Sequence, residues 1–296
     1  MSTEQRETEG TTFVIGDIGG QLDIFEQALR SVGVNTETMV IPEGVTVIQL
    51  GDVIRMHDSP HLDNIAVLAL VDNLRRTNPE QYIQLWGNHE YGALHWHLPG
   101  THWRVEEDHR NALTDAMQDW LDTGCTDIAV AVGETLVTHA GLTHGYWEQI
   151  GSPSTAAEAA AVLNGLSGEL ITTKARAPYG YILNRYTAEP DTNVLWAEAA
   201  TETYPSWISG AEMPFNQVHG HDTPYSHEYS RLKPHTPRAV AERLTVDEAN
   251  RRTILSIGDR TITCVDWVLG ENHHESSWDV LALDGLPDKS GLLRVS

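Results

Sequence analysis

Five residues with metal-binding side chains each follow a short apolar run of the sequence. They are Asp17, Asp52, Asn88, His139 and His221, and a glycine directly precedes four of them. Carboxylate and amide oxygens together with imidazole nitrogens suit a borderline divalent ion such as Mn²⁺, Fe²⁺ or Zn²⁺. Taken singly, the two aspartates could cap helices and the asparagine could form a turn. Five such residues, placed alike in successive segments, favour a metal site.

The chemistry open to such a set is hydrolysis. A carboxylate such as Asp52 can bridge two ions, and two ions about 3.5–4 Å apart can activate water and clamp a phosphoryl group. His89 follows Asn88 directly, and an imidazole there can ligate a metal or carry a proton.

The segments that must position these residues alternate between strand and helix in the first third of the chain. Short apolar runs predict buried strands at 12–15, 45–50 and 82–86, and helical periodicity predicts a helix from Leu22 and another over 62–76. A strand, a polar loop and a helix in repetition predict an α/β sheet with a site at the carboxyl ends of its strands. Asn88 and His89 are expected on such a loop.

The rest of the chain is less regular. It predicts helices over 108–122 and 154–170, a hairpin of 127–132 with 134–138, a strand at 215–218, and a closing antiparallel meander of 252–257, 260–267 and 278–283. We expect a disordered tail at 1–11 and one domain over 12–296. Within that domain, we expect an insertion at about 143–214 that covers the site.

Composition limits the partners. The formal net charge of −23 over 296 residues argues against binding to nucleic acid or to an anionic membrane. An anionic substrate would need local cations, which metal ions can supply. Two cysteines cannot form a zinc–thiolate site or a disulfide framework. With no apolar run of ~18 residues and no apolar leader, we expect a cytoplasmic protein.

The ordered motifs identify a family likeness. Gly16-Asp17, Gly51-Asp52, Gly87-Asn88-His89-Glu90, His139-Ala140-Gly141 and Gly220-His221 together resemble the calcineurin-like metallophosphoesterase superfamily. Within it, they are most similar to the phosphoprotein phosphatase branch, with its bacterial members and the related dinucleoside tetraphosphatases. The resemblance implies a four-layer α-β-β-α sandwich and one or two divalent ions, Mn²⁺ first, with Fe, Zn or Ni as alternatives.

The resemblance also implies roles for these residues. Asp17 would hold the first metal and Asp52 would bridge the two. The second metal would be held by Asn88, His139 and His221. His89 would be the general acid for the leaving oxygen.

The first motif departs from the family pattern Gly-Asp-x-His-Gly, because Gly19 stands where the histidine is expected. A first-metal ligand is therefore missing, and a one-metal or exchange-labile site becomes possible. His219 could compensate, since residues two apart on an extended segment point to the same side. Alternatively, His219 is only a histidine at the end of a strand.

The second motif is one residue short in the stretch after Asp52. Arg55 is the candidate phosphate contact, because a guanidinium matches phosphate oxygens, although it could be a surface charge. The acid that orients the catalytic histidine in the family is missing from its usual position, and Asp58 could substitute for it.

Substrate contacts are expected in the covering segment. Its basic and aromatic cluster could contact a phosphorylated or aromatic substrate, or could be a solvated loop with packed tyrosines. The candidates there are Arg176, Tyr179 and Arg185.

The sequence thus predicts a metal-dependent hydrolase of phosphoric esters that acts through a metal-bound hydroxide. The first expected substrate is a monoester, either a phosphorylated small molecule or a phosphoprotein. One alternative is a dinucleoside polyphosphate hydrolase. Another is a degenerate or repurposed member with an altered first-metal site, which binds or transforms a ligand without phosphate.

Overall fold

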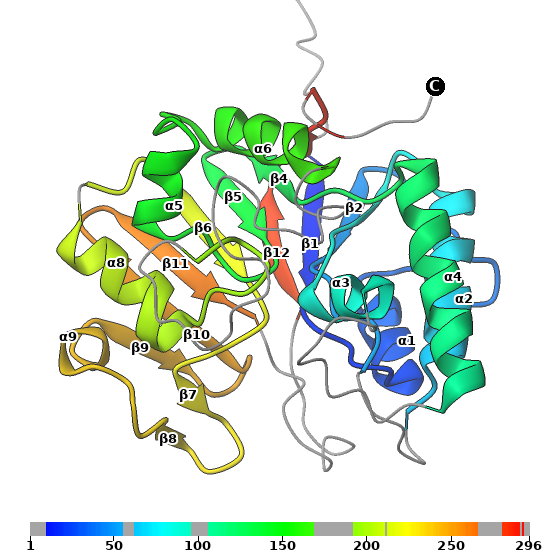
Figure 1. Ribbon diagram of the computed structural model, residues 1–296, viewed down its shortest axis with the longest axis horizontal. Helices are drawn as coiled ribbons and strands as arrows, with labels where there is room; N and C mark the ends of the chain where they lie inside the picture. Colours follow the sequence, from blue (N-terminus) through cyan, green and yellow to red (C-terminus); the bar gives the residue numbers. More distant parts are fainter. Residues whose placement is uncertain are drawn as a thin grey trace, which may run out of the picture.

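The computed structural model describes residues 10–55, 62–95, 106–168, 192–210, 212–265, 280–290 and 292. Two sheets lie at the centre, and helices lie outside them (Figure 1). This arrangement is a mixed α/β fold with helices on both outer sides, as the sequence predicted. No helix among the described residues is both long and apolar enough to cross a bilayer.

The first sheet has four strands in the order β12-β1-β2-β3. Its strands are β1 (Thr11–Ile15), β2 (Val45–Gln49), β3 (Tyr82–Gln84) and β12 (Leu281–Asp284). β1, β2 and β3 are parallel, so their carboxyl ends meet at one edge. β1 begins at Thr11, the last residue of the predicted tail, and residues 1–9 lie outside the described chain.

The second sheet has seven strands in the order β13-β4-β5-β6-β11-β10-β9. Its strands are β4 (Ala129–Val132), β5 (Thr135–Thr138), β6 (Asn216–His219), β9 (Leu244–Asp247), β10 (Arg252–Ile257), β11 (Arg260–Cys264) and β13 (Pro287–Asp288). β5, β6 and β11 run parallel, so the carboxyl ends of β5 and β6 lie at the same edge of this sheet. A separate ribbon pairs β7 (Tyr225–Ser226) with β8 (Arg231–Leu232).

The predicted closing meander is wrong in its third strand. β10 and β11 form the expected hairpin, but β12 pairs antiparallel with β1 in the other sheet. An alternating apolar pattern fits the edge of either sheet, and residues 265–280 separate β11 from β12, so proximity in sequence does not fix the partner.

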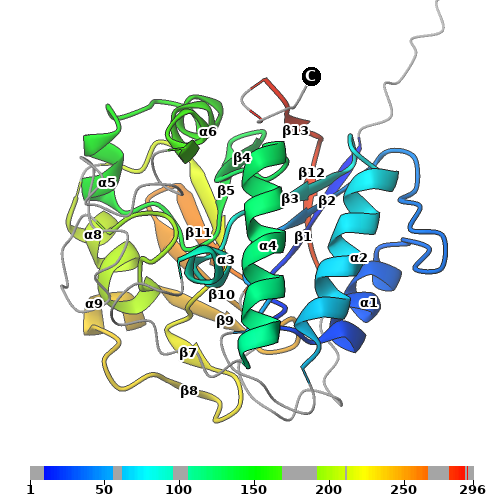
Figure 2. The same cartoon turned by 45° about the vertical axis from the view of Figure 1, so that its right-hand side comes forward.

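The helices of the first half lie beyond the four-stranded sheet. They are α1 (Leu22–Ser31), α2 (Asn64–Thr77), α3 (Asn88–Leu94) and α4 (Glu107–Thr123). α4 packs against both α2 and α3, as the turned view shows (Figure 2). The predicted helices at 22, 62–76 and 108–122 are confirmed within about two residues.

The other helices of the described residues lie on the side of the seven-stranded sheet. They are α5 (His144–Gln149), α6 (Ala156–Gly165), α8 (Tyr204–Ser209), α9 (Arg238–Ala241) and the π-helix η1 (Ala199–Thr203). α6 packs on β4, where the Asn164 amide oxygen accepts the backbone N–H groups of Ile128 and Ala129. Part of the predicted insertion is therefore an outer layer of the fold, and its residues 169–191 lie outside the described chain.

Candidate metal centre

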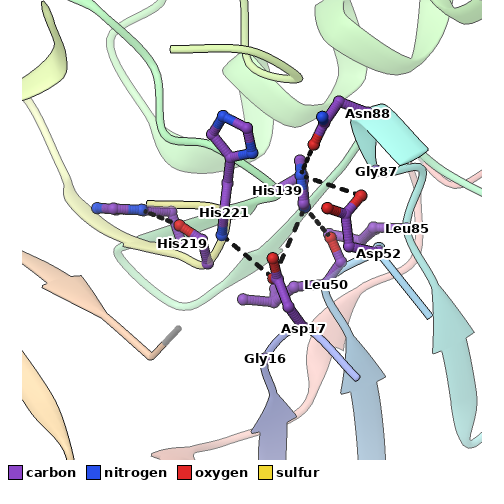
Figure 3. Close-up of polar contacts among 12 residues, drawn as sticks. Gly16, Asp17, Leu50, Asp52, Leu85, Gly87, Asn88, His139, His219 and His221 are labelled. Carbon is purple, nitrogen blue, oxygen red and sulfur yellow. Dashed lines mark hydrogen bonds and ion pairs between the residues drawn. The ribbon is translucent and has the colours of Figure 1, made fainter. Parts of the chain in front are cut away.

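Four of the six residues predicted to bind metal come together at the carboxyl ends of the strands (Figure 3). One ligand atom from each of Asp52, His139 and His221 lies within 4.8 Å of the others. Asn88 joins them, with its amide oxygen 2.9 Å from His139 Nε2. These four residues come from loops or helix starts after β2, β3, β5 and β6, which brings both sheets to one site.

Asp52 is held in a backbone conformation that side chains rarely adopt. Its φ is +52°, in the left-handed region. Its N–H donates to Glu90 Oε2 at 2.7 Å, and its carbonyl accepts the N–H groups of Ile18 at 3.0 Å and Gly19 at 2.7 Å. A Cβ on Gly51 would lie 2.4 Å from the Gly87 nitrogen, so the loops after β2 and β3 meet only because both positions are glycine.

His139 is fully buried, and its hydrogen bonds fix its tautomer. Its Nδ1 lies 2.9 Å from the carbonyl of Leu50, which can only accept, so Nδ1 carries the proton. Burial lowers the pKa of His139 well below its ordinary value, and His221 lowers it further, so the ring is neutral. Nε2 therefore offers its lone pair to the centre, 3.5 Å from Asp52 Oδ1. A ring N–H bound to a backbone carbonyl is the usual support of a metal-ligating histidine.

The centre of the site is surrounded by lone pairs. The Asn88 amide oxygen faces acceptors only; in the swapped orientation its NH₂ would lie 2.9 Å from both His139 Nε2 and His221 Nδ1, and 3.1 Å from Asp52 Oδ2. These acceptors can be balanced in two ways, by the NH₂ of the swapped Asn88 amide or, with the oxygen inward, by a cation. Nitrogen and oxygen donors without thiolate fit a borderline divalent ion, so the residues present fit the metal that the fold implies.

Asp17 lies beside this group without being part of it. Its Oδ1 accepts the backbone N–H of His221 at 3.1 Å and lies 4.0 Å from His139 Nδ1. A Cβ on Gly220 would lie 2.4 Å from the same oxygen, so Gly220 leaves room for the carboxylate. Gly19, where the family has a histidine, has a φ of +55°.

His219 does not join the cluster. Its Nδ1 donates to the carbonyl of Gly220 at 2.8 Å, its Nε2 accepts from the hydroxyl of Tyr204 at 3.1 Å, and burial lowers its pKa to about 4. Figure 3 shows its ring turned away from His139 and Asp52. We expected the side chains of residues 219 and 221 to point to the same side of an extended segment. His221 has a φ of +63°, outside the extended region, so the segment does not continue as a strand through this residue.

His89 lies on the first turn of α3, not on the loop that the sequence predicted. Gly87 is the N-cap, and its N–H donates to Glu90 Oε2 at 3.0 Å. The N–H of His89 donates to Asp52 Oδ1 at 2.9 Å. Its Nδ1 lies 2.9 Å from the carbonyl of Ile54 and 3.3 Å from Asp52 Oδ2, so these two groups orient the ring. Asp58, the predicted orienting acid, lies outside the described residues.

Arg55 is fixed through its backbone. Its N–H donates to Asn64 Oδ1 at 2.8 Å, and its carbonyl accepts from Asn64 Nδ2 at 3.0 Å. This clamp holds the start of the segment that follows Asp52. The other predicted substrate contacts, Arg176, Tyr179 and Arg185, lie outside the described residues.

Two supporting groups were missed in the sequence. Glu90 is fully buried, and its carboxylate accepts N–H groups from Asp52, Gly87 and Ile54, the last at 3.3 Å. An acid three residues after a helix-starting glycine is a recognisable signal for this role. The carbonyl of Ile54, in contrast, has no signature in the sequence.

Comparisons with known proteins agree with this architecture. A family model described as calcineurin-like phosphoesterase matches residues 10–249. A search of curated proteins found no match.

Among solved structures, the chain is similar to three phosphatase-related proteins at 12–15% identity. A cold-active protein-tyrosine phosphatase of a psychrophilic Shewanella species has a TM-score of 0.48, with 15% identity over 87% of this chain and 71% of that one. A Saccharomyces cerevisiae serine/threonine phosphatase has a TM-score of 0.47, with 12% identity over 88% and 68%. A protein provisionally assigned as a diadenosine tetraphosphatase has a TM-score of 0.39, with 14% identity over 95% and 96%. Likenesses this distant say nothing about the substrate.

Proposed function

Because this chain belongs to the calcineurin-like phosphoesterase family and is therefore a hydrolase of phosphoric esters, we propose that it is a metal-dependent phosphomonoesterase. The proposed substrate is a phosphorylated small molecule or a phosphoprotein. The observation that carries the proposal is that ligand atoms of Asp52, His139 and His221 lie within 4.8 Å of one another, with the Asn88 side chain beside them. These donors can hold a cation beside a residue that can transfer a proton, His89.

The proposed metal is a single tightly held Mn²⁺, with Asn88, His139, His221 and Asp52 as its ligands. A divalent ion in this position would polarise a phosphoryl oxygen and make water a better nucleophile at neutral pH. A second ion would be weaker, because Gly19 has no side chain to ligate it.

His89 would supply the proton to the leaving oxygen. The carbonyl of Ile54 holds the proton on Nδ1, so any proton transferred to substrate must come from Nε2. Asp52 Oδ2, 3.3 Å from Nδ1, stabilises the positive charge of the protonated ring. Arg55 is proposed to contact the phosphate, since a guanidinium pairs with two phosphate oxygens at once.

The test is hydrolysis of p-nitrophenyl phosphate by metal-stripped protein titrated with Mn²⁺. Saturable, Mn²⁺-dependent turnover is expected in the wild type and a loss of more than about a hundredfold in His139→Ala. His109→Ala changes an exposed histidine of α4 and serves as the control. Tight Mn²⁺ binding without hydrolysis of p-nitrophenyl phosphate would overturn the proposal that the protein is a general phosphomonoesterase. A parallel assay with a dinucleoside tetraphosphate would then separate a polyphosphate hydrolase from a binding protein.

A further inference from the structure

Two buried glutamines end neighbouring strands of the four-stranded sheet. Gln49 is the last residue of β2 and Gln84 the last of β3, and they are partners in the register of this parallel pair. Their exposed fractions are 0% and 1%. Strands of a parallel sheet covered on both faces normally carry apolar side chains. A buried amide is costly unless its hydrogen bonds are satisfied, so both side chains need a structural reason.

Gln49 contacts the residues that come immediately before the two aspartates of the site. Its Nε2 donates to the carbonyl of Gly16 at 3.1 Å and to that of Gly51 at 2.8 Å. Its Oε1 accepts the N–H of Gly51 at 2.7 Å. The Gln49 side chain thus links the loop that follows β1 to the loop that follows β2. Gly16 leads into Asp17, and Gly51 leads into Asp52.

Gln84 fixes the orientation of the Gln49 amide. The hydroxyl of Tyr82 donates to Gln84 Oε1 at 2.9 Å, which turns Gln84 Nε2 towards Gln49 Oε1 and the carbonyl of Leu85. Gln49 must then present its oxygen to Gln84 and its NH₂ to the two glycine carbonyls. The network from Tyr82 to Gly16 therefore has one consistent arrangement of donors and acceptors.

We propose that Gln49, oriented by Gln84, is a positioning residue that sets the placement of Asp52, and of Asp17 beside it, and thereby the affinity of the site for its metal. The inference rests on the proposed metal centre. Gly51 has a φ of +99° and Asp52 one of +52°, so this turn needs outside contacts to persist. Gln49 binds both the N–H and the carbonyl of Gly51, which clamps the turn directly before the carboxylate.

The test compares Gln49→Met with Asn164→Leu. Asn164 is a matched control, because its buried amide also makes three hydrogen bonds to backbone groups, at Ile128 and Ala129, where β4 begins in the seven-stranded sheet. Mn²⁺ affinity is measured by calorimetry, and the stability of the metal-free proteins by urea denaturation. Both substitutions are expected to lower stability. Only Gln49→Met is expected to weaken Mn²⁺ binding, by about 10–100-fold.

Equal Mn²⁺ affinity in Gln49→Met and Asn164→Leu would overturn the inference. A wild type that binds no Mn²⁺ would instead overturn the proposed metal centre, so the two failures are distinguishable. If Gln49→Met does not fold, Gln84→Met decides the question. This change leaves the glycine partners of Gln49 in place but removes the hydrogen bond from Gln84, so the Gln49 amide can rotate to a swapped orientation. It is expected to weaken binding severalfold, and an unchanged affinity would count against the proposal.

Discussion

Glu90 Oε2 accepts the backbone N–H of Asp52 at 2.7 Å, from the first turn of the helix that carries Asn88. The same carboxylate also accepts the N–H of Gly87 at 3.0 Å. A buried acid therefore links the turn that holds one candidate ligand to the helix start that holds another. Since Asp52 has a positive φ, this hydrogen bond stabilises a backbone conformation that would otherwise be costly.

The buried Glu90 carboxyl is expected to make the free energy of unfolding depend on pH. Burial raises its pKa from 4.5 to about 7, although its N–H donors act in the opposite direction. The folded state thus binds this proton more tightly than the unfolded state. Its contribution to stability is complete below pH 4.5 and is lost as the pH rises through about 7. Relative to Glu90→Gln, the metal-free wild type should lose roughly 3 kcal/mol of unfolding free energy over this window.

Urea denaturation of the two proteins at a series of pH values measures this difference directly. Groups that do not interact with Glu90 titrate alike in both proteins and cancel in the comparison. A difference in unfolding free energy that stays constant across the window would show that the carboxyl has no raised pKa.

Gly220→Ala should displace the Asp17 carboxylate without unfolding the protein. The added Cβ would lie 2.4 Å from Asp17 Oδ1, the end of a side chain that can rotate. Asp17 would then lose its hydrogen bond from the N–H of His221, and we expect Mn²⁺-dependent turnover to fall at least tenfold. The matched control is Gly165→Ala at the end of α6, where a Cβ meets no atom within 4 Å. Equal turnover in both variants would mean that the position of Asp17 is immaterial.

The sequence predicted that the candidate ligands lie together because each follows an apolar run that is typical of a buried strand. Asp17, Asp52 and Asn88 follow three parallel strands, and parallel strands bring their carboxyl ends together. The helix that begins at Asn88 was missed, because Gly87 resembles a chain breaker although here it is the N-cap.

Other features could not be read from local patterns. The pairing of β12 with β1 joins distant parts of the chain, and the residues of neither strand indicate which strand it pairs with. The orienting group at His89 is a backbone carbonyl, that of Ile54, and every residue has one. The turn of His219 away from the site depends on the positive φ of His221, a conformation that non-glycine residues seldom adopt.

His219→Gln should separate a structural histidine from a ligand. Both ring nitrogens of His219 already have protein partners, Tyr204 and the carbonyl of Gly220. We therefore expect the substitution to lower stability by about 1–3 kcal/mol, with Mn²⁺ affinity within about twofold of the wild type. His221→Gln is the comparison, and there the affinity should fall at least tenfold. Calorimetric titration that finds equal losses in both variants would make His219 a ligand after all.

Gly19→His should restore the histidine that the first motif lacks and so strengthen binding of a second ion. Gly19 has a φ of +55°, a conformation that histidine adopts more readily than most residues, at a cost of about 1 kcal/mol. Gly19→Ala is the matched control, because it introduces the same backbone strain without an imidazole. By calorimetry, we expect Gly19→His to bind a second Mn²⁺ more tightly than the wild type or Gly19→Ala does. We also expect it alone to show higher turnover at low Mn²⁺. If both variants bind a single ion with the wild-type affinity, the missing histidine is not what limits the second ion, and Asp17, held by the N–H of His221, becomes the constraint to test.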